Sequence, residues 1–492
     1  MNKHIIVIGA GFAGLSAAAC LAKKGFKVTI LEKNDIAGGR ARKFSAEGFT
    51  FDMGPSWYWM PDVFERYFNL FGKSVTDFYE LKRLDPSYKV VWSENESTDI
   101  PADFQQFMAM CDAFEPGAGE RIKSFLDEAA YKYEVGINKL VYKPSRSLTE
   151  FLDIELITGV FKLDVFTSMS KHIRRFTSHP RLIELLEFPV LFLGATPQNT
   201  PALYSLMNYA DIKLGTWYPI GGMHRIVEAM VSIAESQGVT IKLSHEVKGY
   251  EFDALGNITK VRTHKGDFTA DLVVAGADYH HAEANLLPKE KRSYTEKYWE
   301  KRVMAPSSLL YYVGLSEPVN KLPHHTLFFD RPFERHAHEI YTEPRWPEDP
   351  LFYVSLTTKT DASGAPEGME NMFVLIPAAT GLDGDDEELR IRYFNLVMDR
   401  MEKYCQQDIR SKIVYMRTFA HSDFIADYHA FKGNAYGLAN TLNQTAILKP
   451  SLKSKKVKNL FYAGQLTVPG PGVPPSIISG QVVANEVEKF FH

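Results

Sequence analysis

Apolar positions in the first 32 residues predict a strand, a helix and a second strand. Ile5 to Ile8 form a short apolar run, a helix rich in small residues follows Gly14, and Val28 to Leu31 form a second apolar run. Short apolar runs on either side of a helical segment are typical of a β–α–β unit, in which the strands lie parallel. The chain therefore opens with the start of a parallel sheet.

Two later segments have patterns that fit the same sheet. Alternating positions separated by turn residues predict short strands at 239–243, 247–253, 258–263 and 271–275. Near the C-terminus, an apolar run at 459–464 leads through a proline-rich loop into a helical pattern. We expect these separated segments to form one discontinuous domain, built from residues 1–102, 215–293 and 418–492.

The two intervening segments have different patterns. Residues 294–417 alternate between strand-like runs and an amphipathic helix, which predicts a mixed-sheet substrate domain. Residues 103–214 have helical spacing, and 151–166 and 185–195 are apolar around much of their circumference. Such helices either pack into a core, or line a lipid tunnel or dip into a membrane leaflet. Both alternatives remain open, so 103–214 is interpreted as a helical lid, tunnel and membrane-contact region.

Composition narrows the functional class. The 492 residues carry a formal net charge of −4, which predicts no polyanion-binding surface and no nucleic-acid partner. The three cysteines lie far apart, which fits neither a disulfide framework nor a metal site and favours the cytoplasm. The glycine-broken N-terminal run resembles a strand rather than a signal peptide, and no apolar run is long enough to span a bilayer. Any membrane contact is therefore expected to be peripheral.

The first strand leads into a dinucleotide-binding fingerprint. Gly9, Gly11 and Gly14 form G-x-G-x-x-G, in which the first glycine permits a tight turn, the second lets a pyrophosphate approach and the third allows close packing of helix on strand. Glu32, at the end of the second strand, is placed to accept hydrogen bonds from a ribose. An acid here favours FAD or NAD over NADP. A glycine-rich turn without a ligand is the alternative.

A second glycine-rich segment separates FAD from NAD. "GGRARKF" begins at Gly38 and Gly39 and includes Arg40, and "GFTFDMGPSW" contains Gly54. FAD enzymes of the glutathione-reductase-like class use such a segment to bring backbone and an arginine against the flavin and its phosphates. Arg40 and Arg42 could otherwise be solvated surface charges. The pattern therefore predicts an α/β fold with a discontinuous, glutathione-reductase-like Rossmann domain that binds FAD.

The loop "PGPGVPPSIISG" is the third candidate element of the flavin site. Gly470 and Gly472 allow close approach of the backbone, and prolines fix its path. The helix that follows, from about Pro475, would point its positive end at flavin O2 and stabilise the reduced, anionic flavin. A simple C-terminal turn is the alternative.

These motifs, in this order, resemble the bacterial and fungal type of phytoene desaturase, among the carotenoid and retinoid oxidoreductases of the FAD-dependent amine-oxidase-like superfamily. The landmarks include "VIGAGFAGL", "LEKNDIAGGRA", "GFTFDMGPS", "FLGATPQNTPALYSL", "YPIGGM" and "NLFYAGQLTVPGPGVPPSIISG". The resemblance implies non-covalent FAD, a hydrophobic tunnel for a long polyene, peripheral attachment to the inner face of the cell membrane, and oxygen or quinone as electron acceptor. The expected cofactor-binding residues are Gly9, Gly11, Gly14, Glu32, Gly38, Gly39, Arg40, Gly54, Val247, Gly464, Gln465, Gly470, Gly472, Val473 and Pro474.

The implied reaction introduces C=C bonds into phytoene or a related polyene, with hydride transfer to flavin N5. Once hydride has left an allylic carbon, a weak base suffices for the remaining proton. The candidate acids or bases are Glu150, Asp153, His421 and Asp423, each of which also has an ordinary structural explanation.

The chain departs from the family pattern at three places, which puts a charged catalytic pair in doubt. Val468 stands where many relatives have histidine, Gln465 where related amine oxidases often have an acid, and Asp153 where an arginine follows the first acid.

Several aromatic and histidine residues have both a functional and a structural interpretation. Trp57, Tyr58, Trp59 and Trp217 could line a tunnel or belong to a core. The pairs His280–His281 and His324–His325 have no metal-ligand spacing and are expected at the surface.

Three alternatives remain: a specialised desaturase for a shorter or hydroxylated carotenoid, a FAD amine oxidase, and a prenyl-lipid binding protein without redox chemistry. A charged clamp near the flavin would favour an amine substrate, and a long apolar cavity would exclude one.

Overall fold

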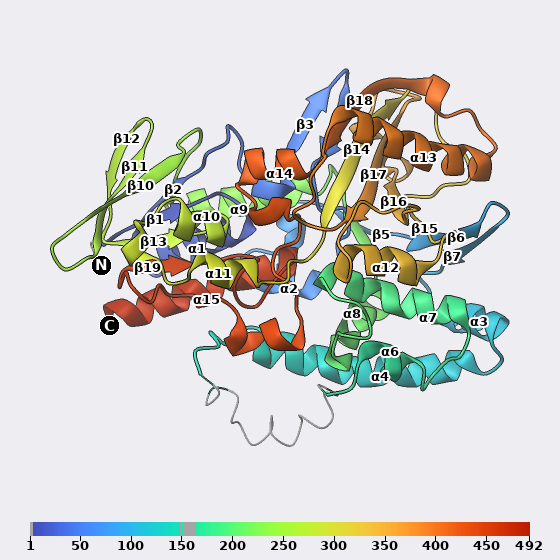
Figure 1. Ribbon diagram of the computed structural model, residues 1–492, viewed down its shortest axis with the longest axis horizontal. Helices are drawn as coiled ribbons and strands as arrows, with labels where there is room; N and C mark the ends of the chain where they lie inside the picture. The colour runs from blue at the N-terminus through green and yellow to red at the C-terminus, as the bar shows by residue number, and fades with distance from the viewer. Residues whose placement is uncertain (1–2, 148–149, 151–163, 165) are drawn as a thin grey trace.

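The computed structural model describes residues 3–147, 150, 164 and 166–492. A five-stranded parallel sheet, in the order β19-β13-β1-β2-β9, forms one half of the molecule (Figure 1). Its strands come from three distant parts of the sequence: β1 (His4–Ile8), β2 (Lys27–Leu31), β9 (Thr240–Lys242), β13 (Leu272–Ala275) and β19 (Leu460–Tyr462). All five are short. Strands β1, β2, β13 and β19 are mostly buried, as their apolar runs predict, whereas β9, at the edge of the sheet, is largely exposed.

Helix α1 (Phe12–Lys23) packs closely on the C-terminal helix α15 (Val473–Phe491), so the two ends of the chain close the nucleotide half together. A Cβ atom added at Gly480 would lie 2.5 Å from the carbonyl oxygen of Ala13. The Ser16 hydroxyl also donates to the carbonyl oxygen of Ile477 at 2.7 Å. Helix α9 (His224–Ser236) packs against α1 as well.

A small antiparallel sheet extends the nucleotide half. It consists of β10 (Val247–Phe252), β11 (Ile258–Thr263) and β12 (Gly266–Thr269). The strands predicted at 239–243, 247–253, 258–263 and 271–275 are confirmed, with small shifts at their ends.

The other half contains a seven-stranded mixed sheet in the order β18-β14-β17-β16-β15-β6-β7, in which only the β15–β6 pair is parallel. Its strands are β6 (Tyr88–Ser93), β7 (Glu96–Ile100), β14 (Ser307–Leu315), β15 (His325–Phe328), β16 (Phe352–Ser355), β17 (Glu370–Ala378) and β18 (Ile413–Phe419). Because β6 and β7 belong to this sheet, the expected domain boundary at residue 102 does not coincide with the sheet topology.

The two faces of the seven-stranded sheet have different neighbours. Along β14, Leu309, Tyr311 and Val313 pack with residues of helix α13 (Glu387–Cys405), whereas Leu310 and Tyr312 belong to the main core. This period of two is what an alternating strand pattern dictates. One face is therefore covered by α13, and the other faces the interior of the molecule.

A helical region lies beside the seven-stranded sheet (Figure 1). It includes α3 (Phe104–Phe114), α4 (Ala118–Val135), α6 (Met169–Ile173), α7 (Pro180–Glu187) and α8 (Leu206–Asn208). Most of the apolar segment 151–166 lies outside the described residues; of its described members, Phe166 is 87% exposed. In the segment 185–195, Leu185 and Leu186 are buried, which favours the core alternative for these two residues.

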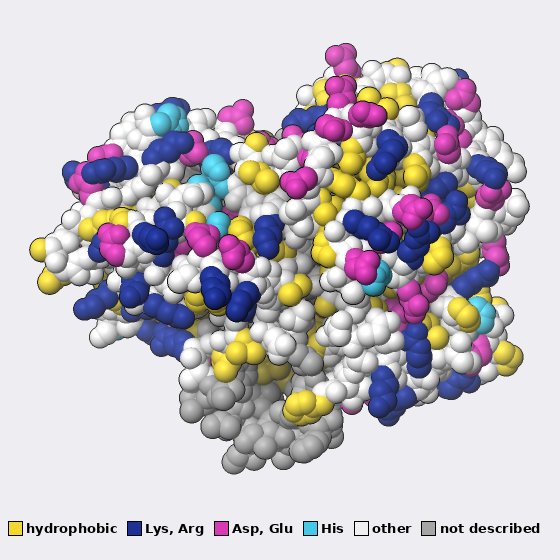
Figure 2. All heavy atoms as spheres, in the orientation of Figure 1, with side chains coloured by type: hydrophobic (Ala, Val, Ile, Leu, Met, Phe, Trp, Pro, Cys, Tyr) yellow, Lys and Arg dark blue, Asp and Glu magenta, His cyan; other side chains and the backbone are white. Residues whose placement is uncertain are grey.

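The surface has no large area of single-sign charge on the face shown in Figure 2, where acidic and basic side chains are interspersed. None of the helices in the described ranges is both long and apolar enough to span a bilayer.

Candidate functional site

The carboxyl ends of the parallel strands meet at one cavity of about 530 Å³. Gly9 follows β1, Glu32 follows β2, Gly276 follows β13 and Gly464 lies just beyond β19, and all four line this cavity. Strands β1 and β13 are neighbours; the chain leaves β1 towards β2 on one side and leaves β13 towards β19 on the other. Ligands of open α/β sheets bind at such a switch point.

Nearly all the predicted cofactor residues meet in this cavity, although they come from five separate segments. The lining includes Gly9, Gly11, Glu32, Gly38, Gly39, Arg40, Gly54, Val247, Gly464, Gln465, Gly470, Gly472, Val473 and Pro474. Gly14 is the one predicted cofactor residue that is not in the wall.

Gly14 has the packing role that the fingerprint assigns to its third glycine. A Cβ atom at Gly14 would lie 2.0 Å from the carbonyl oxygen of Gly9, and one at Gly54 would lie 2.3 Å from the carbonyl oxygen of Arg40. At Gly11, the nearest atom to an added Cβ is 3.9 Å away, at Gly39. Gly14 and Gly54 therefore hold the protein's own backbones together, whereas Gly11 leaves space for something else.

Glu32 is held in a fixed orientation at the end of β2. Its carboxylate is buried and accepts hydrogen bonds from the backbone N–H groups of Ala10, at 2.7 Å, and Asn34, at 2.9 Å. Each carboxylate oxygen can accept a further bond. The side chain can therefore bind a ribose diol without reorganisation.

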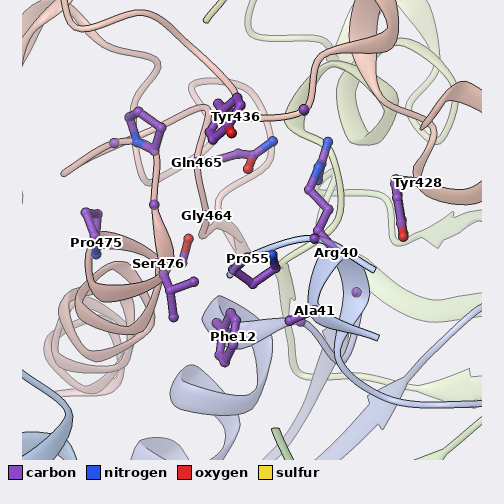
Figure 3. A pocket seen from close by; sticks show the side chains of 18 of the residues that line it. Phe12, Arg40, Ala41, Pro55, Tyr428, Tyr436, Gly464, Gln465, Pro475 and Ser476 are labelled. Carbon is purple, nitrogen blue, oxygen red and sulfur yellow. The ribbon is translucent and has the colours of Figure 1, made fainter. Parts of the chain in front are cut away.

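Arg40 extends along the cavity wall near Gln465 and Tyr436 (Figure 3). Its guanidinium donates to the carbonyl oxygen of Asn434 at 3.2 Å and lies over the ring of Tyr428. Within the described residues it forms no ion pair with a carboxylate. Burial lowers its pKa, although a nearby acid, Asp278, acts in the opposite direction. This cation is therefore available to an anionic ligand.

Arg42 has a different environment. It is buried, and its guanidinium pairs with Asp427 and donates to the hydroxyl of Tyr428 at 3.3 Å. The alternative of a solvated surface charge is wrong for Arg42, because the fold closes over the side chain.

The proline-rich loop reaches the cavity and ends at the N-terminus of α15. Gly470 and Gly472 adopt φ values of +143° and +110°, which side-chain-bearing residues rarely adopt. No side chain caps α15, and none caps α1. Figure 3 shows the start of α15, at Pro475 and Ser476, close to Gly464 and to Phe12 of α1.

These features fit a flavin adenine dinucleotide. Two uncapped helix N-termini, an arginine without a carboxylate partner, a fixed ribose acid and several side-chain-free backbone segments surround one cavity. When FAD is present, the turn after β1 and the start of α1 would hold its pyrophosphate, and the loop before α15 its ring system.

The same cavity continues into an apolar end between the seven-stranded sheet and the helical region. Its walls are aliphatic and aromatic side chains from many elements. They include Trp57, Ile137, Val141, Phe188, Leu206, Met207, Leu310, Leu327, Phe329, Phe333, Ala337, Ile340, Leu351, Phe352, Tyr353 and Leu375. The carboxylates of the lining, in contrast, are Glu32, Glu246, Asp278 and Asp427, which belong to the nucleotide end.

His336, on α12 (Phe333–Tyr341), is the histidine of the apolar end. Its Nε2–H donates to the carbonyl oxygen of Pro377 at 2.9 Å, and its Nδ1 accepts from the N–H of Leu351 at 3.0 Å. Burial lowers its pKa to about 4. Both ring nitrogens are therefore engaged, and the ring is neutral and unavailable as a base.

The described candidates for acid or base do not lie in the cavity wall. His421 is buried and its Nε2 contacts the carbonyl oxygen of Ala379 at 2.6 Å. Asp423 accepts from the N–H of Ala420 at 2.9 Å and pairs with Arg390 at 2.8 Å. Glu150 accepts from the N–H of Arg146 at 3.1 Å. Asp153 lies outside the described residues.

Of the tunnel candidates, Trp57 and Trp59 line the cavity, whereas Tyr58 and Trp217 form a β-bridge outside it. The surface position expected for His324 and His325 is wrong, because both are buried. His325 stacks on Trp57 at 4.4 Å, and its Nδ1 lies 2.6 Å from the Tyr353 hydroxyl. The apolar residues that follow them in "HHTLFF" are a signal that could have placed His325 at the start of a strand, β15 (His325–Phe328), with His324 directly before it.

Residues 12–488 match the family described as flavin containing amine oxidoreductase. A carotenoid 3,4-desaturase of Haloarcula japonica is 41% identical over 485 residues, which cover 98% of this chain and 97% of that protein. A zeta-carotene-forming phytoene desaturase of Myxococcus xanthus is 31% identical over 497 residues, which cover 100% of this chain and 95% of that protein. An oxidoreductase structure from Methanosarcina mazei has a TM-score of 0.64 at 16% identity, covering 99% of this chain and 100% of that one, which is a likeness in fold.

Proposed function

This chain belongs to the flavin containing amine oxidoreductase family, and we propose that it is an FAD-dependent carotenoid desaturase. Membership confirms the predicted flavin cofactor and the FAD-type fold. The reaction would convert a CH–CH bond of a polyene into C=C. The observation that carries the proposal is the continuity of the cavity, which joins the nucleotide cradle to an aliphatic and aromatic chamber.

The residues of the apolar end would orient the polyene and exclude water. Bound flavin supplies the acceptor for a hydride equivalent. Loss of hydride leaves positive charge delocalised along the conjugated chain, and the faces of Trp57, Phe329 and Tyr353 can stabilise that charge through their ring quadrupoles. Exclusion of water from such a wall also protects the cationic chain from hydration.

The apolar end argues against an amine or amino-acid substrate. Among the described residues that line it, we find no carboxylate to bind an ammonium group and no free cation to bind a carboxylate. His336 is held neutral. A prenyl-lipid carrier would tolerate this chamber, but it has no need for Glu32, Arg40 and two uncapped helix ends around a second, nucleotide-shaped space.

The relatives favour a specialised desaturase as a second substrate assignment. The relative named as a carotenoid 3,4-desaturase shares 41% identity, and the one named as a phytoene desaturase shares 31%. We therefore propose phytoene, or a later carotenoid desaturated at its 3,4 bond, as the two substrates to compare.

The protein would collect its lipophilic substrate by peripheral attachment to the cytoplasmic face of the membrane and pass electrons to oxygen or a quinone. Exposed Phe166 and Leu448 support attachment, and the helical region also carries basic side chains (Figure 2). Flotation with anionic vesicles would test it: Phe166→Asp combined with Leu448→Asp should abolish flotation while flavin content is retained. Unchanged flotation of this variant would contradict the assignment of these two residues.

The test of function compares two host strains, one that accumulates phytoene and one that accumulates a later, coloured carotenoid. Expression of the chain should shift the absorption of one pigment pool to the red, because each added C=C lengthens the conjugated system. The Gly11→Ala variant, in which FAD binding should be weakened, is the control. Unchanged pigments in both strains, from protein that retains FAD, would reject carotenoid desaturation.

A further inference from the structure

Lys449 is a buried cation directly behind the flavin-facing loop. Lys449 directly follows the short 3-10 helix at Ala446–Leu448, and it is 5% exposed. A Cβ atom added at Gly470 would lie 3.2 Å from Lys449 Nζ, and Gly470 itself lines the cavity. The Thr467 hydroxyl donates to the carbonyl oxygen of Pro450 at 2.6 Å, which ties this segment to the loop. Gly470 therefore lies between the ammonium group and the space assigned to the flavin ring.

Neither polar group behind Gly470 is satisfied by the described part of the protein. Lys449 Nζ has no hydrogen-bond partner there, and neither does the side-chain oxygen of Asn440, whose residue also lines the cavity. A Cβ atom at Gly470 would lie 3.0 Å from this oxygen. Buried polar atoms are nearly always paired, so two orphans beside one loop indicate a missing ligand charge or hydrogen bond.

No counter-charge is present to offset the burial of Lys449. Burial alone lowers its pKa to about 7, and no charged or titratable group of the described residues contributes. The facing loop residues Thr467 to Gly470 are uncharged, as is Asn440. The next lysines of the segment point elsewhere: Lys453 over the ring of Phe490, and Lys455 over that of Tyr294.

We propose that Lys449 balances the negative charge that the bound flavin gains on reduction, by taking up one proton for every two electrons that the flavin accepts. When a polyene is desaturated, one C–H bond breaks with its electron pair, which transfers as hydride to the flavin, and the adjacent carbon loses a proton. The flavin gains one negative charge. The Lys449 amine binds that proton, or an equivalent one from solvent, and becomes ammonium, so that the site stays neutral.

Lys449 acts across the Gly470 backbone rather than by contact with the reacting atoms, so it is a charge-balancing residue and not a catalytic one. This role of Lys449 requires the flavin of the proposed function but does not depend on the polyene substrate. Opposite charges a few ångströms apart in a dry site attract strongly, which makes the reduced flavin more stable and a better hydride acceptor.

Proton uptake by the wild-type holoenzyme tests the proposal without a substrate or a variant. The full chain with FAD is photoreduced in weakly buffered solution, and protons are counted with an indicator dye. Near pH 6, Lys449 is already protonated, so we expect one proton per two electrons; near pH 8 it is neutral before reduction, so we expect two. One proton at both pH values would overturn the proposal. A decrease from two protons near pH 6 to one near pH 8 would also overturn it, because that trend is expected when the reduced flavin itself loses a proton as the pH rises.

Three variants separate charge from proton uptake. Lys449→Met should take up one proton at pH 8 and bind sulfite, which forms an anionic adduct with flavin, at least about tenfold more weakly at pH 7. Lys449→Arg keeps the charge but cannot deprotonate, so it should take up one proton and keep sulfite affinity within a few-fold. Lys453→Met, the same change four residues on, should behave like the wild type.

Two protons at pH 8 in Lys449→Met, or unchanged sulfite affinity, would reject Lys449 as the group. Should Lys449→Met lose its flavin, the wild-type stoichiometry still decides. Neither proton uptake nor sulfite binding involves a polyene. A negative result in these measurements therefore does not contradict carotenoid desaturation, and a negative carotenoid experiment does not contradict the role of Lys449.

Discussion

The two ends of the cavity are built in different ways. The nucleotide end is made largely of backbone, at turns where glycines replace side chains, and its few charged groups, such as Glu32 and Arg40, have fixed orientations. The apolar end is made of single side chains contributed by many distant elements. A phosphate or ribose needs donors and acceptors at exact points, whereas a polyene needs only a dry, shaped wall.

This difference has a consequence for how tolerant each end is to substitution. Backbone at the nucleotide end packs within contact distance of other backbone, so an added methyl group there displaces main chain. At the apolar end, a changed side chain alters the volume and shape of the chamber but leaves the main chain in place. Mutations should therefore separate flavin binding from polyene binding.

The largest effect is expected for Gly14→Ala. The new Cβ would lie 2.0 Å from the carbonyl oxygen of Gly9 and 3.1 Å from its carbonyl carbon, so α1 and the turn after β1 cannot keep their positions. We expect a loss of about 3 kcal/mol or more in the free energy of unfolding, together with loss of flavin. Chemical denaturation of the apoprotein and flavin fluorescence measure the two effects.

Gly11→Ala is the matched test of the same fingerprint. Gly11 has an ordinary φ of −76°, and the nearest atom to an added Cβ is 3.9 Å away, so the apoprotein should lose at most about 1 kcal/mol. FAD affinity should nevertheless fall at least about tenfold, because the methyl group occupies space meant for the pyrophosphate. Fluorescence titration of apoprotein with FAD measures this. Normal affinity would show that Gly11 does not face the cofactor.

The contrast between the two ends also explains what the sequence could predict. A turn such as Gly9–Gly14, or the loop at Gly470–Gly472, carries its own local signal, because the required backbone conformation restricts the residue type. Fourteen of the fifteen residues proposed for the cofactor accordingly line one cavity, and Gly14 has its predicted packing role.

The apolar end had no such signal. Trp57, Phe188, Leu327 and Ala337 are ordinary core residues in a sequence, and only the packing of the seven-stranded sheet against the helical region shows that they surround a space. The same limit applies to β6, because its parallel partner β15 lies more than 200 residues away along the chain. Tertiary pairing over such distances is not encoded in a local pattern.

The apolar end is tested by filling it. Ala337, on α12, is 6% exposed and lines the chamber. Ala337→Trp should reduce conversion of the polyene at least about tenfold through steric exclusion, with flavin content unchanged. Pigment analysis together with the flavin absorbance ratio of the purified protein measures both, and Ala337→Ser serves as the control for a small change. Loss of flavin in the tryptophan variant would mean that the two ends are not separable.

The smallest effect is expected for Asp211, a carboxyl group behind the apolar wall that burial keeps uncharged. Asp211 is buried, and the hydroxyl of Tyr88, which packs against Trp57, donates to it at 2.8 Å. Burial raises the pKa of Asp211 to about 7, despite the hydrogen bonds from Tyr88 and Thr216. The folded protein therefore keeps a proton that the unfolded chain has already lost at pH 4 to 7, so stability falls as the pH rises through this range and stops falling above the folded pKa.

Asp211→Asn removes this dependence, so the free energy of unfolding of the variant, minus that of the wild type, should rise by about 1 kcal/mol between pH 6 and pH 8. Denaturation at a series of pH values gives the difference, in which other titrations cancel. Asp385→Asn is a control of opposite sign: Arg390 and the hydrogen bonds of Ser422 keep the pKa of Asp385 low in spite of its partial burial. The loss in free energy of unfolding caused by Asp385→Asn should therefore be complete at pH 7, and it should become smaller only as the pH falls below about 4. A flat difference for Asp211→Asn would mean that a charged carboxylate is tolerated beside the chamber, and the contrast between a charged nucleotide end and an uncharged apolar end would then be weaker than the packing indicates.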